Sequence, residues 1–119
     1  MAIKNLTLIT KHLFLCNGCT CKLKGAEESA LTLRQAIIEH GLGDAVHTTK
    51  TLCNGRCNDG PIVISMPDGT WFKGITSAYA QEFIREFLIK NHVPYDHRLY
   101  AYGEDQINVV EPECPAENA

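Results

Sequence analysis

The sequence lacks a long apolar run, a concentration of basic residues and any repeated segment. Its 119 residues carry a net charge of -3, from 11 Lys and Arg against 14 Asp and Glu. A membrane-spanning helix needs about 20 consecutive apolar residues, and proteins that bind nucleic acid usually show a basic stripe. We therefore expect neither a membrane nor nucleic acid as a partner.

Residue patterns for common enzyme chemistry are also missing. No glycine-rich phosphate loop, Ser/His/Asp set or catalytic pair of carboxylates stands out in the sequence. The first ten residues hold one Lys within a mixed apolar pattern, which is unlike a signal peptide. We expect a cytoplasmic protein, in which thiols stay reduced and cysteines serve metal or redox chemistry rather than disulfides.

The sequence does contain six cysteines, five of them in two short clusters. The first cluster spans residues 16–21 (Cys-Asn-Gly-Cys-Thr-Cys), and the second spans residues 53–57 (Cys-Asn-Gly-Arg-Cys). Each cluster follows a strand-like run and contains an Asn-Gly pair, which favours a tight turn. Soft thiolates gathered at two chain reversals suit an iron–sulfur cluster or a zinc ion.

The hydrophobic pattern predicts one α/β domain with the order β-α-β followed by β-β-α. Strands are expected within residues 12–16, 44–52, 62–66 and 70–75, and helices within residues 25–41 and 76–91. Acidic Glu27 and Glu28 complement the dipole at the start of the first helix. This order is that of the thioredoxin-like arrangement, a four-stranded mixed sheet with helices packed on it.

The pattern changes after Val93-Pro94. We expect the domain to span residues 1–93 and an acidic, partly disordered C-terminal extension to span residues 94–119. Within the extension, aromatic residues of 97–102 are expected to pack on the domain, and residues 107–110 to form a short strand. Cys114 lies in the acidic tail and is expected to be an uninvolved thiol.

The predicted topology brings the two cysteine clusters together. If the first two strands are parallel neighbours, both clusters follow the carboxyl ends of their strands at one edge of the sheet. Ligands of α/β folds usually bind at that edge. The loops also contain Lys22, Lys24 and Arg56, which are expected to be solvated or, alternatively, to contact an acidic partner.

Three stretches resemble the thioredoxin-like [2Fe-2S] ferredoxins, which are related to small cluster-bearing subunits of NADH dehydrogenases and bacterial hydrogenases. The first cluster is followed by Gly25-Ala26-Glu27, and the second continues into Gly60-Pro61 and a β-branched strand. Residues 68–74 (Asp-Gly-Thr-Trp-Phe-Lys-Gly) resemble the turn and aromatic-glycine stretch of that family. The resemblance covers residues 12–91 and is most specific in the two cysteine motifs.

The resemblance implies that Cys16, Cys21, Cys53 and Cys57 ligate a [2Fe-2S] cluster. The chain is then expected to be a soluble one-electron carrier rather than an enzyme, with redox proteins as its donor and acceptor. The resembled ferredoxins dimerise, and a small sheet leaves an edge exposed, so a homodimer is the expected assembly.

Cys19 leaves alternatives open. Cys16 and Cys19 have a chelating spacing, so Cys19 could replace Cys21 as a ligand, although the position of Gly25-Ala26 favours Cys21. Cys16 and Cys19 also resemble the active-site dithiol of a thiol–disulfide oxidoreductase, but that function leaves the second cluster unexplained. Four thiolates could also hold a structural zinc ion, which would make the chain a binding module.

Overall fold

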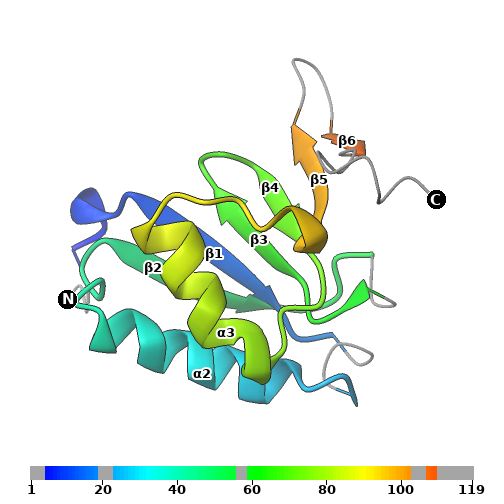
Figure 1. Cartoon of the computed structure of the whole chain (residues 1–119), viewed down its shortest axis with the longest axis horizontal. Helices are drawn as coiled ribbons and strands as arrows, with labels where there is room; N and C mark the ends of the chain where they lie inside the picture. Colours follow the sequence, from blue (N-terminus) through cyan, green and yellow to red (C-terminus); the bar gives the residue numbers. More distant parts are fainter. Residues whose placement is uncertain (1–4, 19–22, 56–58, 103–106, 110–119) are drawn as a thin grey trace.

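A computed structural model describes residues 5–18, 23–55, 59–102 and 107–109 of the chain. Its strands form one mixed six-stranded sheet in the order β2-β1-β3-β4-β5-β6 (Figure 1). The pair β1–β2 is parallel, and the other neighbouring pairs are antiparallel. The strands are β1 (Lys11–Cys16), β2 (Val46–Thr51), β3 (Val63–Met66), β4 (Thr70–Phe72), β5 (Arg98–Tyr102) and β6 (Ile107–Val109).

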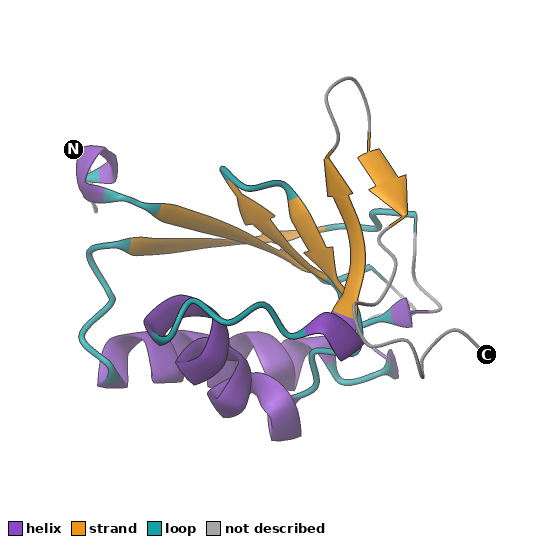
Figure 2. Ribbon diagram, turned by 45° about the horizontal axis from the view of Figure 1, so that its top comes forward, coloured by secondary structure: helices purple, strands orange, loops and turns teal. Residues whose placement is uncertain are grey.

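Two helices cover one face of the sheet and leave the other face open (Figure 2). Helix α2 (Ala26–Glu39) connects β1 to β2, and helix α3 (Ser77–Phe83) follows β4 and continues as the π-helical segment η3 (Ile84–Ile89). The short 3-10 turns η1 (Leu6–Leu8) and η4 (Tyr95–His97) precede β1 and β5. Among the described residues, no helix is long and apolar enough to span a bilayer.

The main core lies between the helices and the sheet. Phe72 of β4 is fully buried, and its ring centroid lies 5.0 Å from that of Phe83 and 4.9 Å from that of Phe87. Leu13 of β1 and Leu33 of α2 belong to the same cluster of buried residues. Alternate residues of each strand point to opposite faces, so this core fixes which strand residues face the helices.

A second, smaller cluster of apolar side chains lies at the end of β1. It combines buried Cys16, Ala26, Ile62 and Ile64 with partly buried Phe14, Trp71 and Leu99. Trp71 also meets Tyr100 of β5 edge to face, with ring centroids 5.6 Å apart. These contacts tie the carboxyl end of β1 to β3, β4 and β5.

The structure confirms the predicted order β-α-β and β-β-α, but the prediction of a four-stranded sheet was wrong. Two further strands, β5 and β6, extend the sheet beyond β4. In the register of β4 and β5, Trp71 pairs with Tyr100 and Phe72 with Arg98. Within the predicted extension, the turn η4 precedes β5, and both β5 and β6 join the sheet. The short strand expected at residues 107–110 is thus confirmed over Ile107–Val109, while residues 103–106 and 110–119 lie outside the described part of the chain.

Candidate metal centre

The first two strands end side by side, as their parallel pairing requires. The register of β1 and β2 pairs Cys16 with Thr51. One residue further on, the Asn17 backbone N–H donates to the Thr51 carbonyl oxygen at 2.8 Å, and the Cys16 N–H donates to the Ile62 carbonyl at 3.0 Å. The two cysteine loops thus leave the same edge of the sheet, as the sequence predicted.

The backbones of the two loops touch at Gly18. A Cβ atom on Gly18 would lie 2.9 Å from Cys53 Cα and 3.0 Å from Cys53 Cβ. Non-bonded carbon atoms pack best about 3.5–4.0 Å apart, so only glycine lets the first loop approach Cys53 this closely. The Cys16 Sγ also donates to the Leu52 carbonyl oxygen at 3.4 Å. Together these contacts hold the Cys16 and Cys53 loops against each other.

The second loop directs a backbone amide at a cysteine sulfur. The Gly55 N–H donates to Cys53 Sγ at 3.3 Å, from a residue with a φ of 88°. The Asn54 Nδ2 donates to Thr51 Oγ1 at 2.7 Å, which anchors the turn to the end of β2. Hydrogen bonds to cysteine sulfurs are one of the features that tune an iron–sulfur cluster. The tight turn expected from the Asn-Gly pair thus directs a backbone N–H at sulfur in this loop.

Asn17 has a role that sequence analysis missed. Its side chain is only 6% exposed, and its Nδ2 donates to the Leu15 carbonyl oxygen at 3.2 Å. Its Oδ1 is buried without a hydrogen-bond partner among the described residues. The Asn-Gly pair predicted a turn, but it did not predict a buried amide beside Cys16 or the contact of Gly18 with Cys53.

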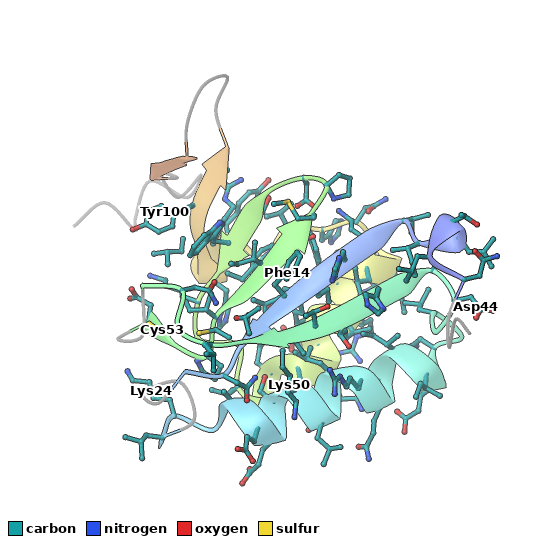
Figure 3. The ribbon with its side chains drawn as sticks, turned by 180° about the vertical axis from the view of Figure 1, so that it is seen from behind. Phe14, Lys24, Asp44, Lys50, Cys53 and Tyr100 are labelled. Carbon is teal, nitrogen blue, oxygen red and sulfur yellow. The ribbon has the colours of Figure 1, made fainter. Side chains whose placement is uncertain are left out.

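The edge of the sheet that carries the cysteine loops is accessible to a partner. Cys16 is buried, whereas Cys53 is exposed. Leu23 and Leu52, next to the loops in sequence, are 88% and 81% exposed and are the two most exposed large apolar side chains in the described part of the chain. Figure 3 shows Lys24 and Cys53 at this same end of the molecule.

The structure describes two of the four predicted ligands, Cys16 and Cys53, and places them in loops that touch each other. Cys19, Cys21, Cys57 and Cys114 lie outside the described residues. Over the described ranges, no three His, Cys, Asp or Glu side chains gather into a metal-binding group. Two thiols from touching loops, one of them accepting a backbone N–H, are nevertheless a donor set that suits an iron–sulfur cluster or zinc.

Comparison with known proteins identifies clear relatives. The chain is 39% identical over 109 residues to a Priestia megaterium protein named "Putative 2Fe-2S ferredoxin", covering 92% of this chain and 84% of the relative. It is 27% identical over 90 residues to "Ferredoxin, 2Fe-2S" from Clostridium pasteurianum, covering 69% of this chain and 88% of the relative. No family model matches the sequence.

A solved structure confirms the predicted thioredoxin-like fold. The chain superimposes on a thioredoxin-like [2Fe-2S] ferredoxin from Aquifex aeolicus with a TM-score of 0.71 and 22% sequence identity. The match covers 78% of this chain and 93% of the Aquifex aeolicus chain. Because the sequence identity is low, this structural match establishes the fold alone.

Proposed function

This chain belongs to the thioredoxin-like [2Fe-2S] ferredoxins, a family of iron–sulfur electron carriers, and from that membership we propose that it carries one electron at a time on a [2Fe-2S] cluster. We propose Cys16, Cys21, Cys53 and Cys57 as the ligands. The observation that carries this assignment is the contact between Gly18 and Cys53, because it joins the two loops that contain all four residues.

The residues around the cysteines have separate tasks in this proposal. When bound, the cluster supplies reversible one-electron chemistry. The chain itself holds the two loops in contact at Gly18 and fixes the second loop through the Asn54 side chain. The Gly55 N–H donates to Cys53 Sγ, so it partly offsets negative charge on this sulfur.

Electron exchange is proposed to occur at the exposed edge of the cysteine loops. Cys53, Leu23 and Leu52 are exposed there, so a redox protein can approach the second loop without displacing core residues. Lys24 and Lys50 are also exposed, and we propose that they offset the negative charge of the reduced site.

A cytoplasmic location and a homodimer complete the proposal. Strand β2 supports the homodimer because it lies at an edge of the described sheet, and edge strands favour pairing or cover.

Spectroscopy and metal analysis of the purified protein test this function. We expect a red-brown protein with two iron and two sulfide per chain, whose visible bands bleach on reduction by dithionite and reappear in air. A colourless protein with one zinc per chain would overturn the proposal in favour of a structural zinc module. Metal-free protein that reduces disulfides, with the activity abolished in Cys16→Ser, would overturn it in favour of a dithiol oxidoreductase.

A further inference from the structure

Two histidines lie side by side on the open face of the sheet, away from the cysteine loops. The register of the parallel pair β1–β2 places His12 directly opposite His47. Their imidazole centroids are 4.8 Å apart, and the ring planes meet at 62°. Both residues are half-buried, and His12 stacks on Phe14, which Figure 3 shows on this open face. Neither histidine has a part in the proposed electron carrier.

The spacing of the two rings matches chelation of one metal ion. A metal–nitrogen bond of about 2.0–2.1 Å places a bound ion about 3.2 Å from each ring centroid. Two such rings have centroids about 4.5 Å apart at a 90° ligand angle and about 5.2 Å apart at a tetrahedral angle. The observed 4.8 Å lies between these values. The paired strands thus hold the centroids of the two imidazoles at chelating distance.

A hydroxyl on β2 orients the His12 ring. The His12 Nε2 and the Thr49 Oγ1 are 2.8 Å apart. With Thr49 as the acceptor, Nε2 carries the proton and Nδ1 is the ring nitrogen with the lone pair. Histidines that bind metals usually donate their second ring N–H in this way, which fixes the tautomer and the ring orientation.

We propose that His12 and His47 bind a late first-row divalent metal ion, such as nickel or zinc, with Thr49 as a positioning residue. Imidazole nitrogen suits these ions, whereas magnesium and calcium prefer oxygen ligands. No third His, Cys, Asp or Glu completes the site among the described residues, so water fills the remaining coordination positions.

The histidine site is distinct from the cysteine loops. His12 precedes Cys16 by four residues along the same strand, which corresponds to about 13 Å at a rise of about 3.3 Å per residue. A metal ion held by His12 and His47 is therefore too far from Cys16 to share a ligand with it. The proposal stands whether or not the cysteines hold a [2Fe-2S] cluster.

Zinc titration calorimetry on the full chain as purified tests the site. We expect one zinc ion to bind with an affinity that falls at least tenfold in His47→Gln and about 10–100-fold in Thr49→Val, the usual effect of removing a partner that orients a ligand. His92→Gln is the matched control, because the His92 side chain is 72% exposed and pairs with Glu86 at 3.6 Å. This control should bind zinc like the parent protein.

Three further readouts separate the possible outcomes. Circular dichroism must show that every variant is folded, and histidine side-chain NMR should show the resonances of His12 and His47 shifting together on zinc addition. The visible spectrum, followed in parallel, reports on the cysteine loops independently. Unchanged zinc affinity in both His47→Gln and Thr49→Val would overturn the proposal. Zinc binding that disappears only in Cys19→Ser would also overturn it, by assigning the ion to a thiol.

Discussion

Substitution of Gly18 by Ala tests how closely the two cysteine loops must approach. The new methyl carbon would lie 2.9 Å from Cys53 Cα and 3.0 Å from Cys53 N, and both are backbone atoms that no side-chain rotation can move away. Since carbon atoms pack best about 3.5–4.0 Å apart, one loop must move by about half an ångström or more. Relief of this overlap would displace Cys53 relative to the first loop.

Overpacking of this kind usually costs about 1–3 kcal/mol. For a domain of this size, 1 kcal/mol corresponds to about 4 °C in the melting temperature, so we expect Gly18→Ala to melt about 4–12 °C lower than the parent protein. Because the substitution separates Cys53 from the first loop, the visible absorbance of the bound cluster should also decay faster at a fixed temperature below the melt. Both quantities can be followed on the same sample.

Gly43→Ala is the matched control. Nothing lies within 4 Å of a Cβ on Gly43, and its φ is outside the left-handed region. Substitution there reduces the entropy of the unfolded chain, so we expect a change between zero and a gain of about 1 kcal/mol. If Gly18→Ala behaved like Gly43→Ala in both melting temperature and cluster lifetime, the close contact between the loops would be refuted.

Four further substitutions test the fold and the second loop. Phe72→Ala removes a fully buried ring and should cost about 3–5 kcal/mol in a thermal melt, whereas Leu31→Ala, at a position 61% exposed, should change the stability little; equal effects would contradict the assigned core. Burial alone would raise the pKa of Asp68, but hydrogen bonds from Lys11 and neighbouring hydroxyls outweigh it and hold that pKa below its usual value. Asp68→Asn should therefore lower the free energy of unfolding by about 0.5–1 kcal/mol at neutral pH. This difference from the parent protein is complete above the unfolded-state pKa of about 4 and vanishes as the pH falls through the lower folded-state pKa. Thermal melts from pH 7 to pH 3 that show a constant difference would contradict this. Gly55→Ala places a side chain at a φ of 88° and should lower the stability by about 1–2 kcal/mol. Because it disturbs the N–H contact to Cys53, it should also shift the reduction potential measured by dye-linked titration. An unchanged potential would show that this contact does not tune the site.

The helices and inner strands could be predicted because each has a local signal. Glu27 and Glu28 mark the start of α2, which begins at Ala26 and ends at Glu39 before Gly41, as expected from the sequence. The run that follows the second cysteine loop became β3, and its turn and hairpin partner became the antiparallel pair β3–β4. These elements have their own hydrophobic periodicity and end signals, so their secondary structure could be predicted without knowledge of tertiary contacts.

Strand β6 falls within the short strand expected at residues 107–110, whereas β5 could not be predicted because its stability comes from pairing. The segment that became β5 is short and has charged and aromatic residues without a clear alternation, and only its register with β4 makes it a strand. Strand β4 also ends earlier than predicted, at Phe72, because the Lys73 N–H turns to the His97 carbonyl at 2.6 Å and Gly74 adopts a φ of 61°. His97 is remote from Lys73 in the sequence, so the local sequence pattern does not reveal this contact.

The chemistry of the candidate site and the edge of the sheet that carries it could be predicted from the sequence. The contacts between its two loops could not. Two strand-terminal cysteine motifs and a parallel β1–β2 pair were enough to predict that the loops of Cys16 and Cys53 leave the same edge of the sheet. The close approach of Gly18 and the burial of the Asn17 amide depend on how the two loops pack against each other. Sequence spacing alone does not determine that packing, so the choice between Cys19 and Cys21 stays a prediction.

Cysteine-to-serine substitutions, followed by electron paramagnetic resonance of the dithionite-reduced protein, test the central claim most directly. The g-values should change or the [2Fe-2S] signal should disappear in each of the variants Cys16→Ser, Cys21→Ser, Cys53→Ser and Cys57→Ser, because an oxygen ligand replaces sulfur or the ligand is lost. Cys19→Ser and Cys114→Ser should leave the signal as in the parent protein. A signal that changes in Cys19→Ser and persists unchanged in Cys21→Ser would contradict the proposed ligand set.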